Sequence, residues 1–471
     1  MANPRIMLAA PRSGSGKTMI TCALLQALSN RGLSVQAFKC GPDYIDPLFH
    51  KKILEVPSRN LDLFFTNETA TRELFLAGDH GDISIIEGVM GLYDGLSGTS
   101  EEASSYHLAK VLRAPIILVV NAKGMGRSLL AEIAGFLSMD SESLIRGVIL
   151  NQVSETFYQT IAPIIQEQLK VAVLGYFPTK KELEVSSRHL GLMLPDEISL
   201  LKEKVDAAAK LLEGSVSVDQ ILRLAKEADL ESPMTKEKEE DFFGEWTDAR
   251  GEVRIGVAMD QAFCFYYEDN LRLLEHMGAR LCFFSPLNDK ALPEGISGLL
   301  LGGGYPELYA KQLSENTEML KAIRQQLEQG MPSLAECGGF MYLHDEIISP
   351  EGVGYPMTGI LHGSCKNSGR LVRFGYATFH LPRKFDGAFD GRAQENISGN
   401  EIRGHEFHYY DSDACGEDAT AFKPVTGKNW KCGYFGEDHY WSFGHLYYPS
   451  NPGFAKWFVD QCKNWREQYG E

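Results

Sequence analysis

The chain has 471 residues, of which 44% are hydrophobic and 10% aromatic, and at about 150 residues per domain this excludes a single small domain, a disordered chain and a fibrous protein. The formal net charge of −17 repels phosphate backbones and no basic stripe offsets it, so we expect no nucleic-acid binding. No apolar run has the length of a membrane helix or signal peptide, and the nine cysteines lack metal-site or disulfide spacing, so we expect a cytoplasmic protein without membrane contact.

The first part of the chain alternates short apolar runs with amphipathic stretches. The runs RIMLAA, SVQAFKC, DISIIEGV, APIILVVNA, IRGVILNQV and VAVLGYFP predict strands, and MITCALLQALSNRG predicts a helix. This alternation is typical of βαβ units around a parallel sheet with flanking helices. The charged stretch from Lys226 to Glu252 interrupts it, so we expect a linker at 226–252 between domains at 1–225 and 253–471.

The second part of the chain resumes the same alternation. The runs VRIGVAMD, ARLCFFSP, ISGLLLGGGYP and MPSLAECGG predict strands, and YYEDNLRLLEHMG predicts a helix because its apolar positions lie three and four apart. From Gly352 onward short alternating runs and many aromatic residues favour β structure. The sequence therefore predicts an α/β protein of two domains.

A glycine loop follows the first predicted strand. The segment APRSGSGKT at 10–18 joins that strand to a helix, so the backbone N–H groups of Gly14, Ser15 and Gly16 can converge on phosphate oxygens. Lys17 would reach the terminal phosphates of ATP and the Thr18 hydroxyl would join a Mg²⁺ shell. The strict phosphate-loop pattern asks for glycine where Pro11 stands, so a glycine turn that only caps the helix is the alternative.

Acidic residues follow the neighbouring predicted strands. Asp43 and Asp46 lie in KCGPDYIDP, and Glu87 ends ISIIEG with Asp94 shortly after it. The carboxyl ends of parallel strands meet at the crevice where ligands of such sheets bind, and Mg²⁺ prefers oxygen ligands. We expect Thr18, Asp46 and Glu87 to hold Mg²⁺, although each acid alone would also fit a solvated loop.

Asn151 and Lys39 also end predicted strands. The Asn151 amide can read the edge of an adenine, or it can simply form a turn. Lys39 can meet an anionic ligand or be solvated.

One of the cysteines has the setting of a nucleophile. Cys337 in SLAECGGFMYL lies between an apolar strand and a helical run, which predicts an exposed thiol at a sharp turn, with a helix N-terminus that favours the thiolate. The Gly338 N–H and an N–H from Gly303 or Gly304 in LLLGGGYPE are candidate oxyanion donors. His445 is the candidate base, although a lone histidine is more often structural.

The sequence GHEFHYY contains two further histidines. His405 and His408 lack a third ligand at useful spacing, so we do not expect a metal there.

Seven segments together resemble the cobyrinic acid a,c-diamide synthase family over nearly the whole chain. They are FKCGPDYIDPLFH, IIEGVMGLYDG, SSRHLGL, AFCFYYEDNL, GGGYPE, AECGGFMYL and GHEFHYY. The resemblance implies an N-terminal ATP-binding domain similar to dethiobiotin synthetase and a C-terminal class I, triad-type glutamine amidotransferase domain. It also implies ATP- and Mg²⁺-dependent amidation of the a and c acetate side chains of a corrinoid, a tetrapyrrole polycarboxylate, with L-glutamine as nitrogen donor.

The resemblance also implies residue roles. Cys337 becomes the glutaminase nucleophile and His445 its base, while the phosphate loop and the acidic residues keep the places given above. The remaining positions near metal and substrate are Lys39, Asp43, Tyr44 and Asp94. Many such glutaminases carry a glutamate two residues after the histidine, but here that residue is Tyr447, so the third member of the triad is undetermined. A weakly oriented imidazole is a hypothesis for slow glutamine hydrolysis until the other site is occupied.

The expected chemistry links the two domains. Transfer of the γ-phosphoryl group of ATP to a carboxylate would give an acyl phosphate, and ammonia released at Cys337 would attack it. Because ammonium has no lone pair, we expect an enclosed path for ammonia.

Two other functions are compatible with the sequence. Amidation of nickel-sirohydrochlorin, in the biosynthesis of a nickel coenzyme, shares these motifs. A deviant phosphate-loop positioning ATPase would have a lysine where Arg12 stands and no use for Cys337. The sequence leaves the order of amidation, the metal state of the macrocycle and the oligomeric state open, with a homodimer among the options.

Overall fold

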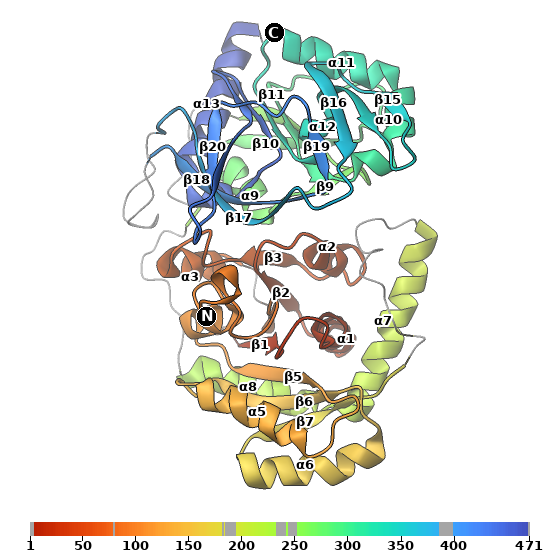
Figure 1. Ribbon diagram of the computed structural model, residues 1–471, viewed down its shortest axis with the longest axis vertical. Helices are drawn as coiled ribbons and strands as arrows, with labels where there is room; N and C mark the ends of the chain where they lie inside the picture. Colours follow the sequence, from red (N-terminus) through yellow and green to blue (C-terminus); the bar gives the residue numbers. More distant parts are fainter. Residues whose placement is uncertain are drawn as a thin grey trace. The chain divides into compact units, whose positions relative to one another are not determined.

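The computed structural model describes residues 4–78, 81–180, 183, 195–231, 242–243, 252–385 and 399–469 (Figure 1). The chain divides into two compact units, Met1–Leu63 with Glu68–Phe242 and Phe64–Asn67 with Phe243–Glu471. The division at 242–243 falls within the expected linker at 226–252, whose first six residues continue helix α8 (Val218–Glu231). The motif SSRHLGL at 186–192 lies outside the described residues.

The first unit is built on a seven-stranded parallel sheet with the order β3-β2-β4-β1-β5-β6-β7. The strands are β1 (Arg5–Ala9), β2 (Val35–Cys40), β3 (Ser58–Leu61), β4 (Ile83–Glu87), β5 (Ile116–Asn121), β6 (Ile145–Asn151) and β7 (Ala172–Phe177). The six apolar runs predicted as strands all form strands of this sheet. Because β1 lies between β4 and β5, its carboxyl end opens at a point where the strand order reverses.

Strand β3 was not predicted from the sequence. Its residues SRNL are mostly polar, so they give no hydrophobic signal, yet all four are buried. The Asn60 amide donates hydrogen bonds to the carbonyl oxygens of Gly41 (2.9 Å) and Asp43 (2.7 Å). This edge strand therefore owes its place to polar contacts with the loop that follows β2.

The helices of the first unit connect these strands. They are α1 (Lys17–Asn30), α2 (Ile45–Lys52), α3 (Glu68–Leu76), α4 (Ser105–Leu112), α5 (Ser128–Met139), α6 (Glu155–Leu169), α7 (Pro195–Ser215) and α8, with a 3-10 turn η1 (Leu96–Gly98). Figure 1 shows α1 beside α7, and both share one apolar core with α8 and with alternate residues of the central strands. This core fixes α1 and the glycine loop at its N-terminus against the sheet.

The second unit contains a six-stranded sheet with the order β10-β8-β11-β13-β23-β22, parallel except for β22. Its strands are β8 (Val253–Ala258), β10 (Ala279–Phe284), β11 (Gly298–Leu301), β13 (Ser333–Glu336), β22 (Tyr434–Phe435) and β23 (His439–Ser442). The four runs predicted as strands before Gly352 form β8, β10, β11 and β13.

From Gly352 onward the described residues form mainly β structure before α13, as the sequence predicted. Three smaller sheets contain β9 (Phe263–Phe265), β12 (Gly303–Gly304), β14 (His344–Ile348), β15 (Gly354–Pro356), β16 (Leu361–Asn367), β17 (Arg373–His380), β18 (Glu401–His408), β19 (Tyr410–Ser412), β20 (Ala419–Phe422), β21 (Asn429–Cys432) and β24 (His445–Leu446). The helical elements are α9 (Glu268–His276), η5 (Pro306–Leu308), α10 (Ala310–Glu315), α11 (Thr317–Glu328), α12 (Gly338–Tyr342), η6 (Tyr448–Ser450) and α13 (Pro452–Tyr469). Within the described parts of the chain, no helix combines the length and apolarity that crossing a bilayer requires.

Candidate functional site

The glycine loop at 10–16 connects β1 to α1. Gly14 (φ +76°) and Gly16 (φ +91°) have left-handed backbone conformations that favour glycine. The Ser15 hydroxyl donates a hydrogen bond to the carbonyl oxygen of Arg12 (2.8 Å), which closes the loop on itself. The N–H groups at the start of the 14-residue helix α1 are therefore available to an anionic group.

Asn151, at the end of β6, braces this loop. Its Nδ2 donates to the carbonyl oxygen of Ser15 (2.7 Å) and its Oδ1 accepts from the N–H of Gln152 (2.9 Å). A Cβ on Gly16 would lie 2.1 Å from Asn151 Nδ2, so the loop and the amide fit only with glycine. These contacts explain the asparagine as a support of the loop, and an adenine contact for it stays a prediction.

The Lys17 side chain contacts the segment that follows β4. Its side chain is buried, and Nζ donates a hydrogen bond to the carbonyl oxygen of Met90 (2.6 Å). Burial, aided by the nearby charge of Lys39, lowers the pKa of Lys17 to about 8. A phosphate beside Lys17 would favour its charged form, so anion binding and protonation of this lysine are coupled.

Three charged side chains meet below the loop. Lys39 Nζ pairs with Asp46 Oδ2 and lies 3.0 Å from Glu87 Oε1, and all three residues are buried. The Thr18 hydroxyl donates to the same Glu87 oxygen (2.7 Å). Burial raises the pKa of Glu87 to about 7, whereas Lys39 lowers the pKa of Asp46 against the effect of burial. Lys39 is thus a buried counter-ion of these carboxylates, and a substrate contact for it stays a prediction.

The oxygen atoms in this cluster fit the donor set that Mg²⁺ prefers. Two carboxylates and a hydroxyl, from Asp46, Glu87 and Thr18, leave room for the waters and phosphate oxygens that this ion usually keeps. Glu87 Oε2 is buried without a hydrogen-bond partner among the described residues. No group of three or more His, Cys, Asp or Glu side chains that could hold a metal occurs in those residues.

The other predicted acidic residues stabilise loops. Asp43 Oδ1 accepts hydrogen bonds from the N–H groups of Ile45 (2.7 Å) and Asp46 (3.4 Å), at the start of α2. Burial raises the pKa of Asp43 to about 6. Asp94 Oδ2 accepts from the Gly91 N–H (3.0 Å), and Tyr44 is buried just before α2. These contacts explain the local structure, and a substrate contact stays a prediction for all three residues.

Cys337 lies at a sharp turn between β13 and α12. Its φ of +49° is unusual for a residue with a side chain, so the turn stores strain at this position. The Cys337 N–H donates to the carbonyl oxygen of Ser442 (2.9 Å), which ties the turn to β23. The thiol, however, is buried and not exposed, and burial raises its pKa well above the ordinary value. The expectation of a thiolate was wrong because α12 has only five residues and desolvation outweighs its dipole.

The predicted oxyanion donors lie close to this turn. The Gly304 nitrogen is 3.0 Å from the position that a Cβ on Gly338 would occupy. The backbones that carry the N–H groups of Gly304 and Gly338 are therefore adjacent. Gly303 has a different environment, because a Cβ there would lie 2.4 Å from His445 Cε1. Gly304 and Gly338 are therefore neighbouring candidate donors. The absence of a side chain at Gly303 leaves space for the imidazole, and a donor role for its N–H stays a prediction.

His445 lies on β24, beside two residues that sequence reasoning missed. Its ring stacks on that of His405, with centroids 5.0 Å apart and planes at 17°, and the two residues are paired across β24 and β18. Glu336 Oε2, one residue before Cys337, lies 3.9 Å from His445 Nδ1. Burial lowers the pKa of His445 well below the ordinary value. The turn that carries the nucleophile and the predicted base therefore meet at Glu336.

Tyr447 replaces the expected acidic residue and has a structural role. Its hydroxyl donates to Asp269 Oδ2 (2.9 Å), and its ring stacks on Phe65 at 4.9 Å. The phenol therefore packs within the second unit, whose members include the segment Phe64–Asn67.

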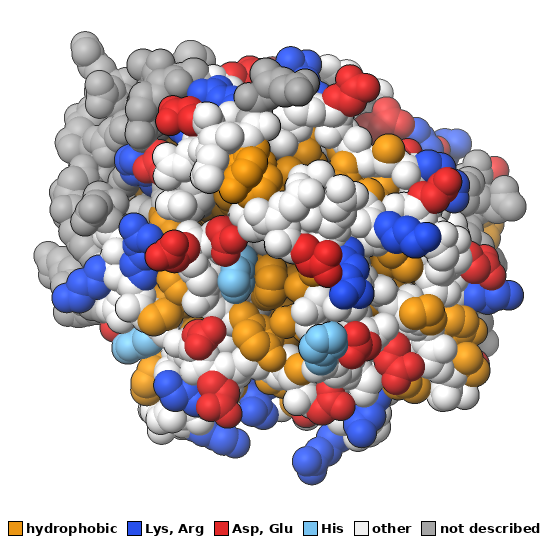
Figure 2. Space-filling view, turned by 90° about the horizontal axis from the view of Figure 1, so that it is seen from above, with side chains coloured by type: hydrophobic (Ala, Val, Ile, Leu, Met, Phe, Trp, Pro, Cys, Tyr) orange, Lys and Arg blue, Asp and Glu red, His pale blue; other side chains and the backbone are white. Residues whose placement is uncertain are grey.

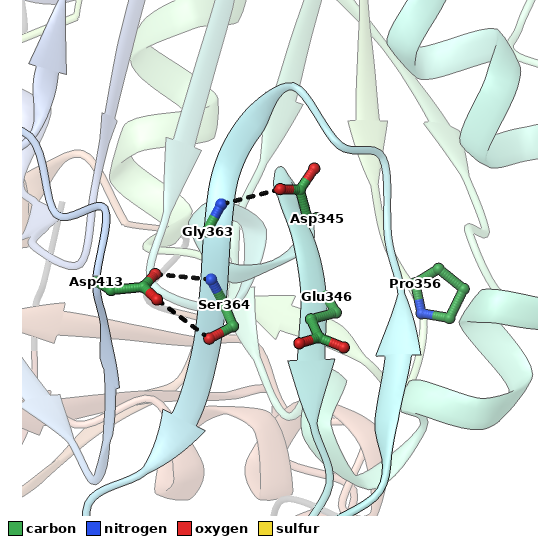
Figure 3. A pocket seen from close by; sticks show the side chains of 6 residues that line it. All are labelled: Asp345, Glu346, Pro356, Gly363, Ser364 and Asp413. Atoms are coloured by element: carbon green, nitrogen blue, oxygen red, sulfur yellow. Dashed lines mark hydrogen bonds between the residues drawn. The ribbon is translucent and has the colours of Figure 1, made fainter.

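A surface pocket of the second unit lies elsewhere. Figure 3 shows its lining residues, Asp345, Glu346, Pro356, Gly363, Ser364 and Asp413, none of which was predicted as a site residue. Asp345 accepts from the Gly363 N–H (3.1 Å) and Asp413 from the Ser364 N–H (2.7 Å), so both carboxylates stabilise the strand β16. Figure 2 shows acidic and basic side chains interspersed over the face that it draws.

Two family models match the chain and define its class. Residues 6–192 match the CobQ/CobB/MinD/ParA nucleotide binding domain, and residues 254–439 match the CobB/CobQ-like glutamine amidotransferase domain. The protein thus joins a nucleotide-binding domain to a glutamine amidotransferase domain.

Curated relatives narrow this class to one family. The chain is 40% identical to the cobyrinate a,c-diamide synthase of Clostridium acetobutylicum, over 96% of this chain and 99% of that protein. It is 39% identical to the enzyme of the same name from Caldanaerobacter subterraneus, over 97% and 98%. The chain belongs to the cobyrinate a,c-diamide synthase family and is a glutamine-hydrolysing carbon–nitrogen ligase.

Two solved structures that are similar to this chain have low TM-scores. PurLQS from Thermotoga maritima is 17% identical, with 45% of this chain and 99% of that chain covered and a TM-score of 0.31. MinD from Pyrococcus horikoshii with Mg-ADP is 20% identical, covers 50% and 99%, and has a TM-score of 0.30. These scores are too low to support an argument.

Proposed function

We propose that this protein uses ATP and Mg²⁺ to amidate the a and c acetate carboxylates of cobyrinic acid with nitrogen from glutamine, in cobalamin biosynthesis in the cytoplasm. Identity to enzymes of that name along nearly the full chain supports this proposal. The observation that carries it is the presence, in one polypeptide, of the braced glycine loop of 10–16 and the strained turn at Cys337 beside His445 and Glu336.

The first unit would activate the carboxylate. A carboxylate is a poor acceptor for ammonia, so the γ-phosphoryl group of ATP is transferred to it and the resulting acyl phosphate has a good leaving group. The N–H groups of Gly14–Thr18 hold the phosphates, and Lys17 offsets their charge. Thr18, Asp46 and Glu87 would hold Mg²⁺, which when bound neutralises phosphate charge.

The second unit would release ammonia from glutamine. Because burial keeps both Cys337 and His445 neutral at rest, the thiol proton passes to the imidazole as the sulfur attacks the carboxamide carbon. The N–H groups of Gly304 and Gly338 stabilise the oxyanion. The C–N bond then breaks, His445 returns the proton to the leaving ammonia, and water hydrolyses the thioester to glutamate. The ammonia, still unprotonated, displaces phosphate from the acyl phosphate.

A product assay tests the substrate. The purified protein is incubated with ATP, glutamine and either cobyrinic acid or nickel-sirohydrochlorin, and mass spectrometry follows the exchange of OH for NH₂. We expect two successive exchanges on cobyrinic acid. Exchange on the nickel macrocycle alone would move the proposal to that substrate, and ATP hydrolysis without exchange on either would support a positioning ATPase.

Two variants test the division of labour. Cys337→Ala should stop amidation from glutamine and leave amidation from free ammonia, whereas Lys17→Ala should stop both, because it acts on the shared activation step. Glutamine-dependent amidation at the parental rate by the cysteine variant would contradict the proposed nucleophile.

A further inference from the structure

We propose that Glu336 is the acidic partner of His445 and holds the imidazole in the tautomer that accepts the thiol proton. Glu336 is then a positioning residue, because it acts on the reaction through the histidine. The inference rests on the proposed glutaminase roles of Cys337 and His445, and it supplies the third member that the sequence around Tyr447 lacks.

The placement of Glu336 links the nucleophile to the base. Glu336 ends β13 and directly precedes Cys337, and its Oε2 lies 3.9 Å from His445 Nδ1. It is paired in register with Ser442 of β23, three residues before the histidine. Both side chains are nearly inaccessible, at 6% exposure for the carboxylate and 3% for the imidazole, so water competes little for their interaction.

The carboxyl group is fixed to the segment that carries the histidine. The Tyr448 hydroxyl donates to Glu336 Oε1 (3.2 Å), and the Leu446 N–H also bonds to the carboxyl group. Asn270 fixes that segment in turn, since it donates to the Leu446 carbonyl oxygen (2.8 Å) and accepts from the Tyr448 N–H (2.8 Å). Hydrogen bonds to the two residues Leu446 and Tyr448, which follow His445, thus orient Oε2 toward the ring.

The plane of the imidazole is set independently. His405 stacks on one face of the ring, and the absence of a side chain at Gly303 leaves space for its edge. Stacking fixes the plane but does not choose which ring nitrogen carries the proton. A carboxylate at Nδ1 makes that choice, because it accepts a hydrogen bond and cannot donate one.

The chemistry balances without a change at Glu336. Nδ1–H donates to Oε2, so Nε2 is the unprotonated nitrogen that accepts the proton from the sulfur as the S–C bond forms. The resulting imidazolium is then stabilised by the carboxylate until the proton goes to the leaving ammonia. The present 3.9 Å separation has to shorten, as catalytic hydrogen bonds often do when substrate binds.

Geometry also predicts a pH dependence. Burial raises the pKa of Glu336 to about 8, and the ionised carboxylate, unlike the neutral acid, carries the charge that stabilises the imidazolium formed at His445. Most other titratable groups around this pair are held neutral near that pH, because burial raises the pKa values of the thiol and the phenols and lowers those of the imidazoles; they are Cys337, Tyr266, Tyr440, Tyr448, His405 and His445. The charge of His408 also acts on His445 and lowers its pKa further. Glutaminase kcat should therefore rise with pH through about 8.

The test uses the full chain and three variants. Glu336→Gln keeps the acceptor for Tyr448 but presents an NH₂ group to Nδ1, which favours the wrong tautomer. We expect glutaminase kcat to fall at least about 100-fold, as for other amide replacements of such an acid, with the KM for glutamine within about threefold and the rise with pH abolished. Glu336→Asp should restore part of kcat and the rise. The matched control is Glu406→Gln, since Glu406 is buried and bonds His408 and Trp430; it should keep the parental pH profile.

Specific outcomes decide the matter. A Glu336→Gln enzyme whose kcat stays within about threefold of the parent, or which keeps the parental rise with pH, overturns the proposal. If that variant does not fold, Glu336→Asp carries the test, because the rise must then occur at a different pH and an unmoved rise overturns it. Cys337→Ala distinguishes failure of the proposed function from failure of this inference. Glutaminase activity that survives in Cys337→Ala refutes the proposed function. Glutaminase activity that is lost in Cys337→Ala but unaffected in Glu336→Gln refutes this inference alone.

Discussion

Replacing Gly16 by alanine tests how the glycine loop is held in shape. The new Cβ would have to occupy a left-handed backbone at φ +91° and would lie 2.1 Å from Asn151 Nδ2. That nitrogen donates the hydrogen bond that connects the carbonyl oxygen of Ser15 to the end of β6. The substitution therefore strains the loop and also displaces its support, two effects that Asn151→Ala separates.

The expected magnitudes follow from these contacts. A left-handed conformation costs an alanine about 1–2 kcal/mol, and displacing Asn151 loses the bond to Ser15 at about 1 kcal/mol, so Gly16→Ala costs about 2–3 kcal/mol. Asn151→Ala loses its two bonds, to Ser15 and Gln152, at about 2 kcal/mol. The double variant has no clash between the new Cβ and Asn151, and it loses the hydrogen bond to Ser15 only once. Its loss of free energy should therefore be smaller than the sum of the two single losses by about 1 kcal/mol.

Calorimetric titration with Mg-ATP measures this cycle, because strain in the binding conformation appears as lost affinity. Gly16→Ala should weaken binding by about 30- to 150-fold, and the double variant should be about fivefold tighter than the product of the single losses. Glutamine hydrolysis serves as the control for the second unit. Single losses that multiply within about twofold would show that the residues act independently and would refute the bracing role of Asn151.

Three further outcomes follow. Lys39→Met should lower the free energy of unfolding of the first unit in urea by about 3–5 kcal/mol. The loss should be smaller at a pH below about 7, where Glu87 takes up a proton, and equal losses below and above that pH would contradict this. Affinity for Mg-ATP should fall above a pH of about 8 as Lys17 loses its proton, a slope that Lys17→Met should lack. Iodoacetamide should alkylate Cys337 at least about tenfold more slowly than free cysteine at neutral pH, because burial disfavours the thiolate. Rapid alkylation would contradict this and would indicate that Cys337 and His445 form a charged pair at rest.

The elements that the sequence predicted are those with local signals. The glycine loop and its helix could be predicted from residues close to them in the sequence. The signals are the apolar run of β1, the glycines of the loop and GKT, which all lie within 14 residues. The same holds for the turn at Cys337. Strand β3 and the bracing of the loop by Asn151 could not be placed, because they depend on contacts with residues distant in sequence.

The partners of His445 show the same limit more clearly. His405 and His445 are 40 residues apart and meet only through the pairing of β18 with β24, and a single sequence contains no information on that register. Glu336 adjoins the nucleophile, yet its relation to the base requires the parallel pairing of β13 with β23. In the sequence, the motif around His405 can be tested only as a set of metal ligands, because residue spacing indicates metal ligands but does not indicate ring stacking.

Both candidate sites limit the charge that they bury. In the first, the single positive charge of Lys39 compensates Asp46 and lies beside Glu87, whose pKa is raised to about 7. In the second, burial leaves a neutral thiol and a neutral imidazole, so charge appears only when the sulfur attacks. A bound glutamine is then needed to make proton transfer from Cys337 favourable, because the oxyanion donors stabilise a charge that does not exist before attack. The hypothesis that glutamine hydrolysis is slow until the other site is occupied stays a prediction. Comparison of the glutaminase rate with and without ATP and cobyrinic acid will check it, and equal rates would contradict it.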